Sequence, residues 1–558
     1  MFHVEHVPRG TKFLVMSKGQ KYYGKIIDLF NEEIFNGEIK VENGKISSIT
    51  KTDFKENSYI LPGFVDSHIH IESSMLTPQH FGRIALSHGT VAVVADPHEI
   101  ANIVGVNGVI YMIENAKGSD LNFFFGAPSC VPATLFESSG AVLNASDIET
   151  LIKEQKLLFL SELMNYPGVI NNDPEIFRKI EIARKYNIRI DGHAPGLIGD
   201  NLQKYIDAGI QTDHECSTLE EAIEKIERGM IIQIREGSAA RNFEALWKLL
   251  DMFPDRTFLC SDDLHPDDLL EGHINLLLSK AVEKGVNLFN LLRSVTVNPV
   301  NHYKLNLGLL RVGDKADFIR VDDLKSFKVS QTFINGRKVF DRADGLNDIP
   351  KQKIINNFNT DVITADSLIV QPYSNRIKVI TVTDGELLTK YFIGSLKGDK
   401  DLSSDISQDI LKLVVLNRYE KENPAIAFVH NFNLKRGAIA SSIAHDSHNI
   451  IAIGVSNEDI AGCINWIISH KGGIAAHTGK EIIGIPLPIA GIISDQSAEI
   501  VASKYKDLNQ IARSLGCKLN APFMTLSFLS LLVIPELKLS NKGLFDGNTF
   551  SFTSLYEI

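Results

Sequence analysis

The chain has 558 residues, of which 44% are hydrophobic and 22% are charged, and its formal net charge at pH 7 is −11. This composition is typical of a folded globular protein and argues against a largely disordered chain. An acidic chain without a clustered Lys/Arg run is also a poor match for the backbone of a nucleic acid, so we expect no nucleic-acid partner.

The terminal segments and the cysteines of the chain indicate its cellular compartment. Residues 1–11 lack the apolar core of a secretory signal, and the apolar stretch at 528–535 is far too short to span a bilayer. The five cysteines form no CxxC pair, which fits a reducing compartment better than a disulfide framework. We therefore expect a cytoplasmic protein without a membrane partner.

Two β-rich segments flank a long central region. Residues 13–60 contain short strands and an Asn43-Gly44 turn, which is a strong hairpin signal. The same pattern returns at residues 306–345, with an Asn335-Gly336 turn. We expect these two segments to form one small β-sandwich domain, with residues 61–305 inserted between them.

The central region, residues 61–305, alternates apolar runs with helical stretches. Eight strand–helix units in about 245 residues match the size of a (β/α)8 barrel. An open doubly wound sheet is the alternative, but it would normally carry a glycine-rich phosphate loop, and neither GxGxxG nor GxxxxGK[ST] occurs here. We therefore predict an α/β fold built on a TIM-like barrel. Its buried parallel strands are expected at 63–66, 91–94, 121–125, 157–160, 188–190, 211–213, 230–234 and 257–259.

From residue 346 onward the pattern changes again. A polar stretch at 347–360 is the expected linker. The remainder, to residue 558, mixes strands and helices and predicts a separate C-terminal α+β domain over 346–558. We expect strands at 377–383 and 449–455 and helices at 437–444, 460–469 and 497–515.

Histidine and carboxylate side chains follow nearly every predicted strand of the barrel. The C-terminal ends of the strands are where catalytic residues of such barrels lie. His68 and His70 are two positions apart on a strand, so they point to the same side and can share a metal ion. Imidazole and carboxylate groups are the ligands of borderline and hard divalent ions, so the pattern predicts a metal centre. The other candidate ligands at strand ends are Glu162, His193, His214 and Asp262.

Six candidate ligands indicate two ions rather than one. A single tetrahedral or five-coordinate ion does not need six protein ligands, whereas two ions about 3.5–4 Å apart do. A bridging carboxylate is then expected, and we assign it to Glu162 on the central strand. Such a pair would lower the pKa of a bound water toward neutrality and supply a hydroxide nucleophile. Asp262 is expected to bind one ion and to carry a proton to the leaving group.

Residues 61–70, Leu-Pro-Gly-Phe-Val-Asp-Ser-His-Ile-His, resemble the first-strand signature of the amidohydrolase superfamily. The resemblance implies a metal-dependent hydrolase on a barrel with a small β domain. It extends over roughly residues 20–558, where several segments look like those of the bacterial adenine deaminases of that superfamily. Those segments are 71–76, 95–100, 161–164, 192–196, 261–263 and 445–449.

The resemblance implies hydrolysis of adenine at C6, which gives hypoxanthine and ammonia in purine salvage. It also implies a Glu162 bridge, where many relatives use a carboxylated lysine. Manganese or iron(II) is implied as the metal, and the ligand types also permit zinc. Gly196 stands where the mononuclear adenosine deaminases need a glutamate as proton donor. Without that glutamate, Asp262 would have to transfer the proton of the hydroxide to the leaving amine.

Candidate contacts to the purine lie near the same strand ends. A purely structural hydrogen bond or ion pair stays open for each of them. Two interpretations also stay open for residues 445–449: the loop covers the barrel mouth, or Asp446 and Asn449 cap a turn. A homodimer is expected, as is common for a cytosolic enzyme. The candidate contacts are His98, Glu99, Arg235, Glu236 and Asp263.

Two other functions compete with this hypothesis. A related binuclear amidohydrolase acting on a cyclic amide would share the metal site, although a glutamate on the fourth strand counts against it. A non-catalytic scaffold relative is the second alternative. Such a protein would be expected to have lost metal ligands, and all six candidates are present.

Overall fold

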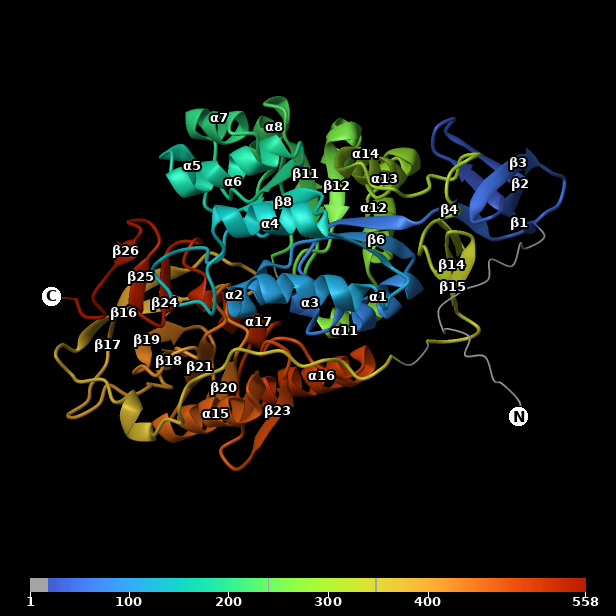
Figure 1. The fold of residues 1–558 in the computed structure, drawn as a ribbon. Coiled ribbons are helices and arrows are strands. Elements are labelled where there is room, and N and C mark those ends of the chain that lie inside the picture. The colour runs from blue at the N-terminus through green and yellow to red at the C-terminus, as the bar shows by residue number, and fades with distance from the viewer. Residues whose placement is uncertain (1–18, 239, 347–348, 558) are drawn as a thin grey trace, which may run out of the picture.

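The computed structural model describes residues 19–238, 240–346 and 349–557 (Figure 1). Residues 13–18 of the first predicted β segment, and the terminal residues from which the absence of a signal was inferred, lie outside the described residues. Among the helices that the structure describes, none combines the length and the apolar character needed to cross a membrane. All five cysteines are buried and none forms a disulfide.

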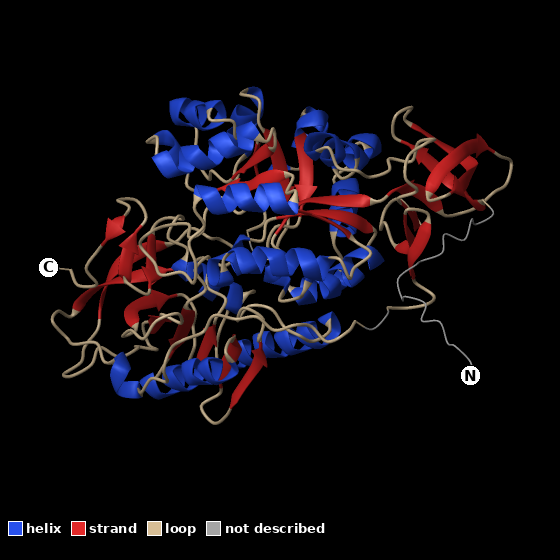
Figure 2. Ribbon diagram, viewed as in Figure 1, coloured by secondary structure: helices blue, strands red, loops and turns tan. Residues whose placement is uncertain are grey.

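Eight short parallel strands surrounded by helices form the centre of the molecule, which confirms the predicted α/β class (Figure 2). Each strand overlaps one of the eight predicted apolar runs, and most of them extend further toward the C-terminal end. The strands are β5 (Phe64–Ile69), β6 (Thr90–Ala95), β7 (Asn122–Phe125), β8 (Phe159–Leu163), β9 (Arg189–Gly192), β10 (Thr212–Asp213), β11 (Ile231–Arg235) and β12 (Thr257–Cys260).

Main-chain contacts close these strands into a ring. The strands pair as β5–β6–β7, β8–β9 and β10–β11–β12. Because the last group returns to the first, the carboxyl ends of all eight strands meet around one opening. The contacts that join the groups are the bridges Ala127–Leu160 and Ile69–Asp262 and the hydrogen bond from Gln211 N to Ile190 O.

Side-chain caps start several of the helices that cover the barrel. The Thr77 hydroxyl accepts from the main chain at the start of α1 (Pro78–Ser87), and Asn144 caps α4 (Ala145–Gln155) in a capping box with Asp147. The other helices of this region are α2 (His98–Val104), α3 (Val106–Ala116), α5 (Tyr166–Ile170), α6 (Pro174–Lys185), α7 (Gly199–Asp207), α8 (Leu219–Glu227), α9 (Phe243–Leu246), α10 (Leu249–Met252), α11 (Pro266–Glu271), α12 (Ile274–Glu283), α13 (Leu288–Ser294) and α14 (Val297–Tyr303).

Strands from before and after the barrel form one seven-stranded sheet, at the right of Figure 1. The two segments join where β4 pairs with β13 in antiparallel register. Both Asn-Gly pairs form the predicted hairpin turns with positive φ, as a type I′ turn requires. The strands are β1 (Gln20–Asp28), β2 (Glu33–Glu42), β3 (Lys45–Lys51), β4 (Tyr59–Pro62), β13 (Phe318–Val321), β14 (Val329–Ile334) and β15 (Arg337–Asp341).

The C-terminal region contains an eight-stranded sheet and lies below the barrel in Figure 1. Its long helix α16 packs against α11 of the barrel. The elements are β16 (Arg376–Thr381), β17 (Lys390–Ser395), β18 (Ile410–Leu416), β19 (Ala425–His430), β20 (Ala438–Ser441), β21 (Ile450–Gly454), α15 (Asn457–His470), β22 (Gly473–His477), β23 (Ile482–Pro486), α16 (Ala498–Ser514), α17 (Pro522–Ser527), β24 (Leu537–Ser540), β25 (Gly543–Asp546) and β26 (Ser551–Phe552).

The prediction of a helix at residues 437–444 is wrong. Within this segment, Ala438–Ser441 form strand β20, which is buried and pairs with β21 on one side and β22 on the other. A short run of alanine and isoleucine suits a buried strand as well as a buried helix, and the two neighbouring strands decide the outcome.

A buried lysine fixes the chain next to one predicted metal ligand. The Lys225 ammonium pairs with Asp213 and with Glu221, at 2.7 Å from Glu221 Oε1. It also donates to Ala194 O at 2.7 Å, directly after His193. Burial would lower the pKa of Lys225, but the Asp213 carboxylate raises it above its ordinary value. Burial would likewise raise the pKa of Asp213, and Lys225 lowers it.

The Lys225→Met variant is expected to lower the free energy of unfolding by about 3–5 kcal/mol, because it leaves the Asp213 carboxylate buried without a cation. Denaturant unfolding at pH 7 measures the loss. Lys204→Met, at an exposed position on α7, is the control and should change little.

The pH dependence gives a second test of this ion pair. Because the folded pKa of Asp213 is depressed, its contribution is present above about pH 4 and is lost as the pH falls through the folded pKa. The stability difference between wild type and Lys225→Met should therefore be largest near neutral pH and shrink on acidification, as Asp213 of the variant takes up a proton. A difference that grows on acidification would contradict the assignment.

Candidate metal centre

The carboxylate of Glu162 lies at the centre of a cluster of imidazoles at the carboxyl ends of the barrel strands. Its Oε1 is 3.3 Å from His70 Nε2 and 3.4 Å from His98 Nδ1. Its Oε2 is 2.9 Å from His193 Nδ1 and 3.2 Å from His214 Nε2. All five side chains are buried. Each carboxylate oxygen therefore faces its own pair of histidines, which is the geometry expected of a bridging ligand.

Asp262 lies on the side of the cluster that carries His68 and His70. Its Oδ1 lies 3.5 Å from His68 Nε2 and 3.3 Å from His70 Nε2. Its Oδ2 pairs with Arg235, which also holds Glu215 at 2.5 and 2.8 Å. The φ of Asp262 is 54°, a conformation that ordinary residues rarely adopt and that cores retain at functional sites. The structure thus brings all six candidate ligands together.

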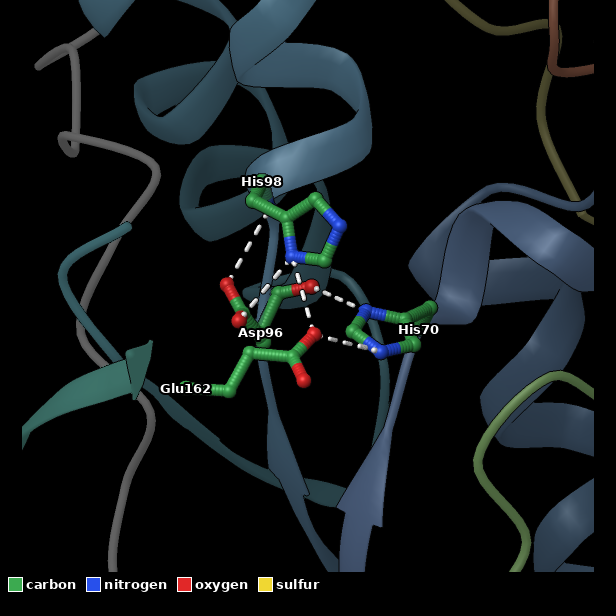
Figure 3. Close-up of side chains that lie close together, drawn as sticks. All are labelled: His70, Asp96, His98 and Glu162. Carbon is green, nitrogen blue, oxygen red and sulfur yellow. Dashed lines mark hydrogen bonds and ion pairs between the residues drawn. The ribbon is translucent and has the colours of Figure 1, made fainter. Parts of the chain in front are cut away.

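Asp96 orients two of the imidazoles, as Figure 3 shows. Its Oδ2 is 3.0 Å from His98 Nδ1, and its main-chain oxygen is 3.2 Å from His70 Nδ1. Carboxylates and carbonyls in this position fix the ring and its tautomer. His98, expected as a substrate contact, therefore lies beside the candidate metal ligands.

The donor set fits divalent metal ions. His68 Nε2, which faces Asp262, is buried and has no hydrogen-bond partner among the described residues. A buried ring nitrogen without a partner is costly, and a metal ion relieves that cost. Burial would raise the pKa of Glu162, but hydrogen bonds and charge from His193 and the other imidazoles hold it well below its usual range. The carboxylate is thus ionised, as a metal ligand must be.

The expected substrate contacts divide into two groups. Glu99, Arg235 and Asp263 line the cavity above the cluster. Glu236 does not: it lies 2.5 Å from Lys280 Nζ and lines a separate cavity. Its carboxylate pairs with Lys280 and does not face the metal cluster, and a substrate contact for Glu236 stays a prediction.

The loop that begins at His445 enters the site from the C-terminal region. His445 Nδ1 is 2.6 Å from Glu99 Oε1, and His448 Nε2 contacts the other carboxylate oxygen. His448 Nδ1 accepts from the N–H of Ala444 at 3.2 Å, so its proton resides on Nε2 and points at Glu99. Burial would lower the pKa of His445, but Glu99 raises it to about 9. His445 and Asp446 line the cavity, so this loop covers the barrel mouth.

Sequence reasoning missed part of the site. Asp96 directly follows β6, and Glu215 lies two residues after the end of β10, so the strand-end rule that found the other ligands could have found them. The apolar wall of the cavity carried no such signal, because its side chains look like ordinary core residues of a distant segment. That wall consists of Leu387, Phe528, Leu531 and Ile534.

The Glu162→Gln variant is expected to bind fewer than one metal ion per chain, where wild type is expected to bind two, because the neutral amide is a poor bridge between cations. Metal analysis after manganese loading and desalting measures this. Glu236→Gln is the matched control and should keep the wild-type metal content, since its carboxylate pairs with Lys280 away from the cluster. A full metal complement in Glu162→Gln would contradict the bridging role.

Known proteins match both parts of the chain. A family model described as "Amidohydrolase family" matches residues 59–339, and one described as "Adenine deaminase C-terminal domain" matches residues 386–551. A relative from Methanosarcina barkeri named adenine deaminase is 51% identical over 547 residues, which cover 96% of this chain and 99% of the relative. Another with the same name, from a Sulfurovum species, is 53% identical over 527 residues, covering 94% and 98%.

Solved structures resemble the chain more distantly. A β-aspartyl dipeptidase from Fervidobacterium islandicum aligns with 59% of this chain and 98% of its own, at 17% identity and a TM-score of 0.45.

The similarity to the curated relatives runs through the barrel and the C-terminal region alike. About half of the residues are identical along nearly the whole chain, which confirms the resemblance inferred from short segments of the sequence. The chain therefore belongs to the amidohydrolase family and, within it, to the adenine deaminases.

Proposed function

We propose that the protein hydrolyses adenine at C6 and releases hypoxanthine and ammonia, a purine-salvage reaction. The observation that carries the proposal is Glu162, whose two oxygens each face a pair of histidines at the barrel mouth. Relatives named adenine deaminase, matched over almost the full chain, support the choice of substrate.

Two divalent ions would occupy the cluster, manganese or iron(II) in preference to zinc. Glu162 would bridge them. When bound, the ions supply a water of lowered pKa and a Lewis acid beside the reacting carbon. The proposed ligands are His68, His70 and Asp262 on one side of Glu162 and His193 and His214 on the other.

Asp262 would move the proton. Arg235 holds Oδ2, which leaves Oδ1 on the side of the cluster. Burial would raise the pKa of Asp262, but Arg235 and the nearby imidazoles hold it well below its usual range, so the group starts ionised. Oδ1 would accept a proton from the attacking water and pass it to the amine, which leaves only after protonation.

Glu99 and Asp263 would contact the purine, with His98 and Arg235 behind them. Hydrogen bonds from His445 and His448 fix the Glu99 carboxylate, and the Ser73 hydroxyl donates to Asp263 Oδ1 at 2.5 Å. Carboxyl groups held in this way are preorganised for a ligand.

Several broader expectations stay predictions. We expect one β domain from residues 13–60 and 306–345, a barrel domain over 61–305 and a C-terminal domain over 346–558. A homodimer and a cytoplasmic location are likewise predicted.

Manganese-loaded protein is expected to release ammonia from adenine, and at far lower rates from adenosine or a hydantoin. A coupled ammonia assay with the three compounds in parallel measures this. Glu162→Gln is expected to abolish the activity, because the metal pair is lost. Hydrolysis of the hydantoin without ammonia release from adenine would favour the cyclic-amide alternative.

The His448→Ala variant is expected to lower kcat by about 10–100-fold with unchanged metal content, because His448 positions Glu99 and does not contact the cluster. Steady-state kinetics and metal analysis on the same preparation separate the two effects. His470→Ala, exposed at the end of α15, is the control and should keep the wild-type kcat. An unchanged kcat in His448→Ala would rule out the positioning role.

A further inference from the structure

The cavity above the cluster has two chemically different sides. The barrel side is made of imidazoles, carboxylates and Arg235, with Met164 as its apolar member. The opposite side comes entirely from the C-terminal region and is mostly apolar. Its residues are Leu387, His445, Asp446, Phe528, Leu531 and Ile534.

Asp446 is the carboxylate on the C-terminal side of the cavity. One of its two oxygens, Oδ2, has no hydrogen-bond partner among the described residues. The residue is 3% exposed, and its Oδ2 is buried. His445, 3.9 Å from Oδ1, already donates to Glu99 at 2.6 Å. An unpaired buried acceptor is costly and is expected to be satisfied by a ligand in the cavity.

Other carboxylates around the cavity are already engaged. Both oxygens of Glu99 contact histidines, and both oxygens of Glu215 contact Arg235. Both oxygens of Glu162 face imidazoles. Asp446, on the C-terminal side, thus offers a substrate a buried acceptor oxygen that has no hydrogen-bond partner among the described residues.

The orientation of a purine selects which of its donors reaches Asp446. The reacting carbon must lie at Glu162 and Asp262, and the exocyclic amine is bonded to that carbon. A free purine base has one other hydrogen-bond donor, the N–H of its imidazole ring. That N–H lies at the far end of the base, which then faces the C-terminal side.

We infer that Asp446 is a specificity-determining residue, whose carboxylate accepts the imidazole-ring N–H of a free purine base. A nucleoside lacks this donor, because the sugar occupies the nitrogen, and it would leave Oδ2 unpaired against an apolar wall. Sites that hydrogen-bond a substrate group reject analogues that lack it. The inference rests on the proposed function and adds the basis on which the free base is selected.

The test compares adenine with 9-methyladenine, which has the same amine but no imidazole N–H. Wild type should prefer adenine by about 10–100-fold in kcat/KM, the range expected for a hydrogen bond to a charged group. In Asp446→Ala this preference should fall below about threefold, mainly through a higher KM for adenine.

Asp446→Asn removes the charge of the acceptor without adding space, and its amide oxygen can still accept a weaker hydrogen bond. The amide keeps the size of the side chain but loses the charge, so the preference should again fall while metal content stays at the wild-type value. Ser447→Ala, at the next residue and outside the cavity lining, should keep the full preference. A wild-type preference retained in both Asp446 variants would overturn the inference.

Failure of the proposed function can be told apart from failure of this inference. Wild type that releases no ammonia from adenine would refute the function. Calorimetric binding of adenine and 9-methyladenine to the metal-loaded protein then tests the contact directly. Tighter binding of adenine that is lost in Asp446→Asn supports the contact, and equal binding of the two bases overturns it.

Discussion

The site depends on one buried carboxylate. Glu162 sits where water is excluded, and it is stable there as an anion because four imidazoles surround it. Such an arrangement is costly without bound cations, since the buried ring nitrogen Nε2 of His68 lacks a hydrogen-bond partner among the described residues. Imidazole and carboxylate groups are also the ligand types that divalent ions prefer.

Charged groups behind the cluster keep its ligands in place. Arg235 ties Asp262 to Glu215, and Asp96 orients His70 and His98. These groups determine which ligand atoms face the ions, and so they link the packing of the barrel to the chemistry at its mouth.

The C-terminal region belongs to the site and is more than a covering layer. Two histidines of its loop, His445 and His448, form hydrogen bonds with the Glu99 carboxylate. His445 lies 346 residues further along the chain than Glu99. Its apolar residues form the wall opposite the cluster. The barrel thus supplies the candidate metal ligands, while the C-terminal region supplies most of the apolar lining of the cavity.

The barrel strands and the six candidate ligands could be predicted from the sequence, because a buried strand and the side chains at its end are local patterns of neighbouring residues. The folded chain was needed to show that Glu99 faces the cavity while Glu236 pairs with Lys280. It also decided that β20 is a strand and that Asp446 reaches the barrel mouth. These outcomes depend on contacts between segments that lie from tens to hundreds of residues apart, as for Glu236 with Lys280 and Glu99 with His445, and no local pattern encodes them.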